Sequence, residues 1–301
     1  MYRKPINPST SLGMVSGSTV LSGSPSKDLS NHCPMLFILV SLLFLTLSSA
    51  AQTKDSSRRK LAEPEQGKEK AVTLDTDPNL VGWWKLDDAS GETAADSSKN
   101  GRNRQDALRQ GTLKGGLSFD KNSVSGKIGK ALNLDGSDDY IQITKYKGVT
   151  GTRPRTVMAW LKTTTPKGEI ISWGLNDYGQ MWIFGFIRGR VGVTPNGGYF
   201  YMNPEVHDDA WHHVAAVVHD ADLPNLHDDV TLYKDGKLAE IHDIGLLDLW
   251  PIETGSDLDV TIGKEFKGII DDVRIYDRAL TEEEIKALFE LKSNQPLPKP
   301  R

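Results

Sequence analysis

Two adjacent acids near the C-terminus, Asp271 and Asp272, are the residues of this sequence with the clearest chemical potential. The period-two alternation of GIIDDVRIY predicts a β-strand that places the two acids on opposite faces. The face of Asp271 would also hold Ile269, Val273 and Ile275. An ionised carboxylate in an apolar row costs several kcal/mol unless it is paired or bound to a metal. A β-bulge would exchange which of the two acids faces inward.

A second group of oxygen-bearing side chains follows a predicted first strand, in the loop 87–100. The group consists of Asp87, Asp88, Glu92, Asp96 and Asn100. Such hard oxygen ligands suit Ca²⁺. Because the first and last strands of a sandwich commonly pair, we predict a structural calcium ion, and its ligands would be Asp88, Asp96, Asn100 and Asp271. The alternative is that Asp271 caps backbone N–H groups of a loop while Asp272 pairs with an arginine.

Two further groups that could bind metal have simpler structural explanations. His213 and His219 share a face of one predicted strand but lie about 20 Å apart, at roughly 3.3 Å per residue. One zinc ion needs all its ligands about 2 Å away. The acidic turn 135–139 could hold another cation, but a plain turn with Asx hydrogen bonds is the favoured explanation.

Aromatic residues in the middle of the sequence are the candidates for binding sugar. A saccharide is held by stacking on exposed rings, so a lectin needs aromatic side chains that face solvent. The predicted ligand-binding set is Trp173, Tyr178, Trp182, Tyr199 and Tyr201. Tyr199 and Tyr201 alternate beside a Gly-rich turn and therefore share a face. For each ring taken alone, burial is the competing explanation, because large aromatics dominate sandwich cores.

Short strands have to position these residues. Apolar segments such as 156–162 and 181–188 recur at short intervals without helices between them, and Asp235–Gly236 predicts a two-residue hairpin turn. Thr281 and Glu284 form a capping-box pattern at the start of a helix over 281–291. The sequence therefore predicts an all-β fold, a two-sheet antiparallel jelly-roll sandwich with one short C-terminal helix.

The N-terminal part of the chain predicts export. The apolar run 35–47 is shorter than the roughly 20 residues of a membrane span, and small residues suited to signal cleavage follow it. We expect a secreted protein, or one in the periplasm or cell envelope, that contacts the membrane only if residues 35–51 remain as an anchor. The predicted organisation is an extension with signal peptide or anchor (1–51), a disordered linker (52–78), one domain (79–291) and a disordered tail (292–301).

Composition narrows the possible partners. The net charge is −4, which disfavours nucleic acid as a partner because phosphate contacts need a basic face. A mildly acidic domain suits neutral glycans or a divalent cation better. Cys33 is the one cysteine of the sequence, so no intrachain disulfide is possible, and because it precedes the apolar run it cannot be a lipidated cysteine following a signal sequence.

Six strings in order resemble laminin-G-like jelly-roll domains of the concanavalin A-like lectin/glucanase superfamily, in the form common in exported bacterial proteins. They are LVGWWKLDDASGETAADSSKNG, GKIGKALNLDGSDDYIQI, TVMAWLK, WHHVAAVV, VTLYKDGKL and GIIDDVRIYDRALTEEEIKAL. The resemblance covers 79–291, implies the sandwich fold and is compatible with a structural calcium. It leaves function open, because this fold carries lectins, adhesins, hydrolases and structural modules.

Catalysis is the less favoured function. Relatives similar to laminarinases carry Glu-x-Asp-x-Glu on one strand, which aims three carboxylates into one cleft. No such string occurs here, and the pair Asp257 and Asp259 lacks a third acid. We expect an exported, non-catalytic binding module that recognises carbohydrate or a cell-surface protein. The alternatives are a glycan hydrolase or lyase of the same fold, or a purely structural envelope module.

Overall fold

The computed structural model of the protein describes residues 74–98, 109–245 and 250–293. The predicted signal or anchor segment, Asn100 and the last residues of the tail lie outside these ranges. Within the described ranges, no helix combines the length and the apolar character needed to cross a bilayer.

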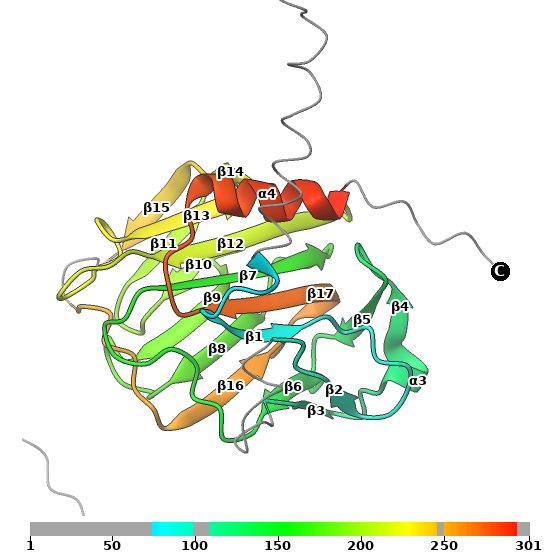
Figure 1. Ribbon diagram of the computed structural model, residues 1–301. Helices are drawn as coiled ribbons and strands as arrows, with labels where there is room; N and C mark the ends of the chain where they lie inside the picture. Colours follow the sequence, from blue (N-terminus) through cyan, green and yellow to red (C-terminus); the bar gives the residue numbers. More distant parts are fainter. Residues whose placement is uncertain (1–73, 99–108, 246–249, 294–301) are drawn as a thin grey trace, which may run out of the picture. The chain divides into compact units, whose positions relative to one another are not determined.

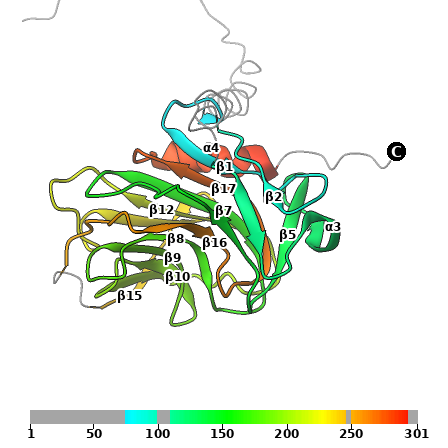
Figure 2. The ribbon, with the colours of Figure 1, turned by 90° about the horizontal axis from the view of Figure 1, so that it is seen from below.

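Two antiparallel sheets form the two layers of a sandwich, which confirms the predicted fold class (Figure 2). The described strands of the first sheet, sheet A, are β1 (Leu80–Trp84), β4 (Ser123–Ser125), β5 (Lys130–Asp135), β7 (Arg155–Lys162), β12 (His212–Val218), β13 (Val230–Lys234), β14 (Lys237–Leu238) and β17 (Lys267–Tyr276). They lie in the order β14-β13-β12-β7-β17-β5-β4, and β1 pairs with the last part of β17 (Figure 1). The first and last long strands are therefore neighbours, as predicted.

The second sheet, sheet B, makes the other layer. Its described strands are β2 (Thr93–Ala94), β3 (Gly111–Lys114), β6 (Tyr140–Ile143), β8 (Glu169–Gly174), β9 (Met181–Ile187), β10 (Arg190–Thr194), β11 (Tyr199–Met202), β15 (Ile241–Gly245) and β16 (Leu258–Ile262). Their order is β15-β11-β10-β9-β8-β16-β6-β3-β2.

Helix α4 (Glu282–Ser293) covers the outer face of sheet A (Figures 1 and 2). Its capping box forms as predicted. The Glu284 N–H donates to Thr281 Oγ1 at 3.3 Å, and the Thr281 N–H donates to Glu284 Oε2 at 2.9 Å. The short helix α3 (Phe119–Asn122) was not predicted from the sequence.

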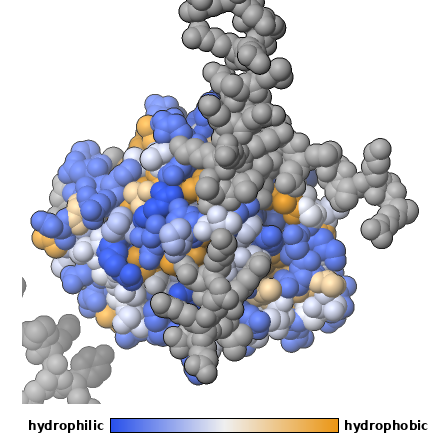
Figure 3. Space-filling view, in the orientation of Figure 1, coloured by the Kyte–Doolittle hydropathy of each residue, from blue (hydrophilic) through white to orange (hydrophobic). Residues whose placement is uncertain are grey.

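Burial along the strands reveals which sheet face remains open. Every residue of β12 is buried, because one face meets sheet B and the other meets α4. On β9, by contrast, the buried residues Trp182 and Phe184 alternate with half-buried ones. A strand that alternates in this way has one face turned to solvent. The face that carries β1 and α4 is mostly hydrophilic at its surface (Figure 3). The outer face of sheet B is thus the large sheet surface that no described element covers.

A bulge in β17 corrects the predicted distribution of its side chains. The register against β7 shifts between Asp271 and Arg274, and Asp272 has a φ of 49°. Val273 therefore joins Ile270 in the core between the sheets, while Asp271 and Asp272 both lie on the outer face. The prediction that Asp271 shares a face with Val273 and Ile275 is wrong, because an inserted residue resets the period of two.

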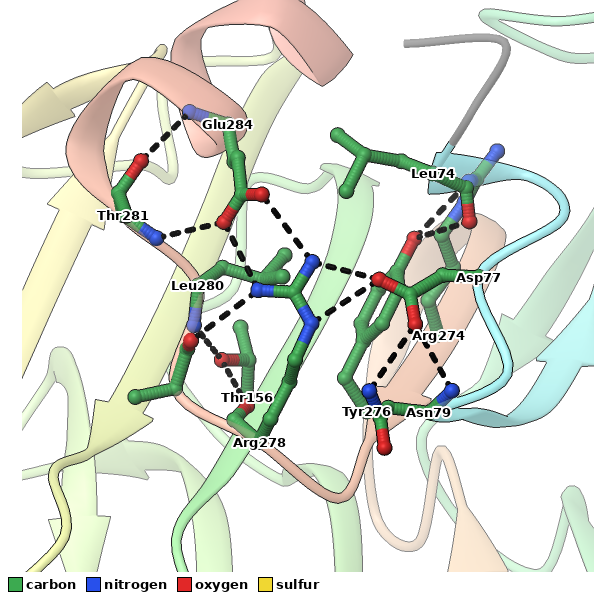
Figure 4. A network of polar contacts seen from close by, with 11 residues as sticks. Leu74, Asp77, Asn79, Thr156, Arg274, Tyr276, Arg278, Leu280, Thr281 and Glu284 are labelled. Carbon is green, nitrogen blue, oxygen red and sulfur yellow. Dashed lines mark hydrogen bonds and ion pairs between the residues drawn. The ribbon is translucent and has the colours of Figure 1, made fainter. Parts of the chain in front are cut away.

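The segment before β1 is anchored on sheet A, although it falls in the predicted linker. Leu74 is buried beneath α4, and Asp77 Oδ2 accepts two hydrogen bonds from Arg278 (Figure 4). Asp75 lies 2.5 Å from Arg274. The folded domain therefore includes Leu74, and the segment that leads into β1 lies next to the C-terminal helix α4.

Candidate functional site

A row of polar side chains crosses the open face of sheet B. Cross-strand pairing aligns Gln142 with Thr261, and Thr261 with Ser172. The row continues through Ile183 to Thr194. It spans β6, β16, β8, β9 and β10, a distance of about 20 Å at about 4.8 Å per strand. Gln142, Thr261, Ser172 and Thr194 are thus aligned perpendicular to the strands, with the apolar Ile183 between the last two.

Two adjoining hollows make this row the floor of a groove, called here the sheet B groove. Their volumes are about 260 Å³ and 380 Å³, and they share Met181, Leu258 and Lys264. The remaining lining residues are Tyr140, Gln142, Glu169, Ser172, Trp173, Asn176, Ile183, Thr194, Asn196, Asp259 and Thr261. Polar groups beside a few apolar ones are the usual lining of a site that orients a small or chain-like ligand.

Charges in the groove nearly cancel. Among the described lining residues, Lys264 is the cation, and Glu169 and Asp259 are the carboxylates. Asp259 forms an ion pair with Lys147 at 2.8 Å. Glu169 Oε2 accepts a hydrogen bond from the Ser172 hydroxyl at 2.5 Å. Both carboxylates therefore already have partners within the protein.

An exposed aromatic pair lies at one end of the groove. The rings of Tyr178 and Trp250 stack with centroids 5.1 Å apart and an interplanar angle of 13°. Tyr178 is 57% exposed and Trp250 is 41% exposed. The Gly179 N–H donates to the Asn196 carbonyl at 2.8 Å, which joins the loop of Tyr178 to the groove lining. Sequence reasoning proposed Tyr178 but missed Trp250, because the loop that presents it has no distinctive pattern.

The other predicted ligand-binding aromatics are less accessible. Trp173 and Trp182 are fully buried and contact each other in the core, with ring centroids 5.9 Å apart. Tyr201 is buried as well, and Tyr199 stacks on it at 5.7 Å, so the two share a face as their spacing predicts. Arg188 lies over the Tyr199 ring, 4.7 Å from its centroid. The predicted set therefore does not form one solvent-facing platform.

The acid site on β17 lies on the opposite sheet. Asp271 is fully buried, and its Oδ2 accepts a hydrogen bond from the Ile128 N–H at 2.9 Å. Its Oδ1 has no hydrogen-bond partner among the described residues. Burial, together with the nearby carboxylates of Asp272 and Asp87, raises the pKa of Asp271 to about 8.

Both parts of the alternative to a calcium site are present in the structure. Asp271 caps the loop between β4 and β5, and Asp272 pairs with Arg274 at 3.0 Å while accepting a hydrogen bond from Trp83 Nε1 at 2.6 Å. The loop leaves no space for side chains near the acids. A β-carbon on Gly126 would lie 2.7 Å from Asp271 Oδ2, and one on Gly129 would lie 2.4 Å from Asp87 Oδ1.

The remaining predicted calcium ligands are used locally. Asp96 Oδ1 accepts hydrogen bonds from the Trp83 and Ser98 N–H groups at 3.0 and 2.9 Å. Asp88 Oδ2 accepts from the Ala95 N–H at 3.2 Å. Across the described ranges, three or more potential metal-binding side chains come within 4.8 Å of one another only at Asp135, Asp138 and Asp139. Asp88, Asp96 and Asp271 are therefore not gathered in this way, and Asn100 lies outside the described residues.

The chain belongs to the concanavalin A-like lectin/glucanase superfamily. The model of the family described as "Concanavalin A-like lectin/glucanases superfamily" matches residues 135–286. This range contains the whole groove and the closing strand β17. Because the superfamily includes both lectins and glucanases, membership alone leaves binding and hydrolysis open. No curated protein matches the chain.

Several solved structures are similar in fold. Domain 4 of AbnA, an extracellular arabinanase from Geobacillus stearothermophilus solved with arabinotriose, is 19% identical with a TM-score of 0.49, covering 70% of this chain and 98% of that one. The binding domain of Paraclostridial mosquitocidal protein 1 is 17% identical, with a TM-score of 0.47 and coverages of 70% and 52%. The receptor-binding domain of botulinum neurotoxin type G is 16% identical, with a TM-score of 0.44 and coverages of 71% and 51%. The chain spans about half the length of the last two.

Proposed function

We propose that this protein is an exported, non-catalytic binding module that holds a segment of a carbohydrate chain in the sheet B groove. The observation that carries the proposal is the row from Gln142 through Thr261 and Ser172 to Thr194 on the open sheet face. Sugar hydroxyls need hydrogen-bonding partners along the whole length of a bound chain. The four polar side chains of the row offer such partners over about 20 Å, although Ser172 and Thr261 also hydrogen-bond to each other at 2.9 Å and Ile183 interrupts the row.

The engagement of the groove carboxylates supports binding rather than hydrolysis. A glycosidase needs two carboxyl groups flanking the scissile bond, one of which donates a proton. In the described lining, Asp259 is neutralised by Lys147, and Glu169 is hydrogen-bonded to Ser172. Neither environment resembles the apolar pocket that keeps a catalytic carboxylic acid protonated.

A glycan array with the protein and its Thr261→Val variant tests this function. Valine keeps the shape of the side chain but removes the Thr261 hydroxyl from the row, so affinity for the bound glycan should fall about tenfold. Thr231→Val on sheet A is the matched control and should bind as the wild type does. If no glycan binds, or if both variants bind equally well, the groove is not a carbohydrate site. Shortened products after incubation with a bound glycan would indicate the hydrolase instead, and capture of a cell-surface protein alone would indicate the other partner class.

We also propose that a structural calcium ion neutralises Asp271. Support comes from its buried Oδ1, which lacks a described partner, and from the Asp87 carboxylate close enough to raise its pKa. Both are hard oxygen ligands of the kind that Ca²⁺ prefers. Asp87 is the loop acid that contributes to raising the pKa of Asp271, although its Oδ1, like oxygens of Asp88 and Asp96, also caps a backbone N–H group.

Melting curves with calcium and with a chelator test the ion. Calcium should raise the melting temperature of the wild type by several degrees, because an ion bound only to the folded state stabilises it. The Asp271→Asn variant should lose this response. A wild type that melts at the same temperature under both conditions would refute the calcium proposal without affecting the carbohydrate proposal.

A further inference from the structure

Two of the exposed large apolar side chains, Tyr178 and Trp250, form a stacked pair beside the sheet B groove. The full set among the described residues is Tyr178, Leu223, Leu238, Trp250 and Leu258. Leu258 lines both hollows of the groove, and Tyr178 and Trp250 stack on each other at its end. Single exposed apolar residues need no explanation, but a stacked pair beside a polar groove does.

Backbone contacts hold the two aromatic rings at that end. A β-carbon on Gly197 would lie 2.6 Å from a ring carbon of Tyr178 and 2.6 Å from one of Trp250, so both rings pack directly on this glycine. Asn196, the preceding residue, lines the groove and donates a hydrogen bond from Nδ2 to Asn176 Oδ1 at 3.5 Å. The polar floor thus leads into the aromatic pair through two amide side chains.

We propose that Tyr178 and Trp250 form an aromatic subsite that stacks against a sugar ring of the chain bound in the groove. This inference rests on the proposed carbohydrate function and extends it. A pyranose or furanose ring has an apolar C–H face that packs on an aromatic ring, while its hydroxyls point sideways to groups such as Asn176 and Asn196. The stacked pair gives a large, rigid contact at little cost in side-chain entropy.

The charges of the groove define the class of glycan as uncharged. Lys264 and Glu169 line the same hollow, and Asp259 is paired with Lys147. A sulfated or uronic acid chain would place an anion at every repeat along a lining that has one described cation. Leaving those anions without partners is unfavourable, so neutral polysaccharides are the expected ligands.

Electrophoresis through gels that contain one polysaccharide each tests the subsite. The panel is arabinan, galactan, a soluble cellulose derivative and β-1,3-glucan, with polygalacturonate as the acidic member. The wild type should be retarded by at least one neutral polysaccharide and not by polygalacturonate. Trp250→Ala and Tyr178→Ala should each weaken binding about tenfold. Trp250→Phe should retain part of the wild-type affinity. Leu238→Ala on β14 is the control and should have no effect.

The possible outcomes distinguish failure of the aromatic subsite from failure of carbohydrate binding in the groove. Normal retardation of Trp250→Ala alongside weak retardation of Thr261→Val would refute the aromatic subsite and leave the proposed function intact. A wild type that no neutral gel retards would overturn both. Retardation by polygalacturonate alone would overturn the assignment to uncharged glycans. Because both aromatic side chains are exposed, the variants should fold, and unchanged circular dichroism checks this.

Discussion

The carboxylate of Asp77 accepts two hydrogen bonds from the guanidinium of Arg278, at 2.9 and 2.5 Å, although the two residues are 201 positions apart. The same guanidinium binds Glu284, whose carboxylate also receives the Thr281 N–H at the start of α4 (Figure 4). One arginine therefore fastens the entry of the domain to the cap of its last helix. Planar, multiply bonded arginines of this kind are stronger than isolated surface ion pairs.

Replacing Arg278 by methionine should lower the free energy of unfolding by about 2 kcal/mol, because it leaves two partly buried carboxylates without their common partner. Urea denaturation followed by tryptophan fluorescence measures this change. Lys286→Met provides the control, since Lys286 and Glu290 form an exposed pair at 3.7 Å that should contribute less than about 0.5 kcal/mol. Equal losses in the two variants would contradict the role given to Arg278.

Features that depend on neighbouring residues could be predicted from the sequence. The turn at Asp235–Gly236, with φ values of 52° and 74°, and the capping box of Thr281 follow from local chemistry. The two-sheet architecture also follows, because strand alternation and the order of the six strings that resemble the family constrain it. The bulge at Asp272 does not, because it depends on how β17 pairs with β7 on one side and β1 on the other.

The candidate site was predictable only in part. Trp173 and Tyr178 lie close together in the sequence, yet Trp173 is fully buried and Tyr178 is 57% exposed. Their difference arises because Trp173 belongs to a strand facing the core and Tyr178 to a loop. The row that begins at Gln142 joins strands distant in sequence, so it becomes visible only when the register of sheet B is known.

Asp271 should make stability depend on pH when calcium is removed. Its pKa is raised from 3.8 to about 8, so its stabilising contribution is complete below the unfolded value and is lost as the pH rises through about 8. In chelator, the free energy of unfolding of the wild type should therefore fall towards alkaline pH. Asp271→Asn keeps a neutral side chain, and at about pH 8 it should exceed the wild type by at least about 1 kcal/mol.

Urea denaturation across that pH range checks the expectation. Asp228→Asn is the control, since its side chain is 69% exposed and should leave the wild-type curve unchanged. Saturating calcium should reverse the order of wild type and Asp271→Asn. Parallel curves for these two proteins in chelator would show that Asp271 does not titrate in the folded state within this window.

His212 should stabilise the fold more in acid than in base. Its Nδ1 lies 2.9 Å from Asp235 and its Nε2 lies 2.9 Å from Asp208, and the hydrogen bond with Asp235 is the main reason that the pKa of His212 is raised. The stabilisation is complete below the unfolded pKa of about 6.5 and is lost as the pH rises through the higher folded value. His212→Ala should therefore cost about 1 kcal/mol more at about pH 5.5 than at about pH 8.5. In an Asp235→Asn background this pH-dependent part should shrink, and an unchanged difference would contradict the assignment.

Alanine substitutions at Gly236 and Gly91 distinguish the stability cost of backbone strain from the stability cost of a steric clash. Both have positive φ values, 74° and 86°, but a β-carbon on Gly236 would lie 3.0 Å from the ring of Phe289 on α4, whereas one on Gly91 would meet nothing within 4 Å. Gly91→Ala should therefore cost about 1 kcal/mol, and Gly236→Ala about 2 to 3 kcal/mol, by urea denaturation. In a Phe289→Ala background the excess at Gly236 should shrink, because the ring is gone while the β-carbon of residue 289, at 3.1 Å, remains. Equal losses of unfolding free energy at the two glycines would mean that α4 can shift without a cost in stability. The hairpin and the helix would then not pack as one unit.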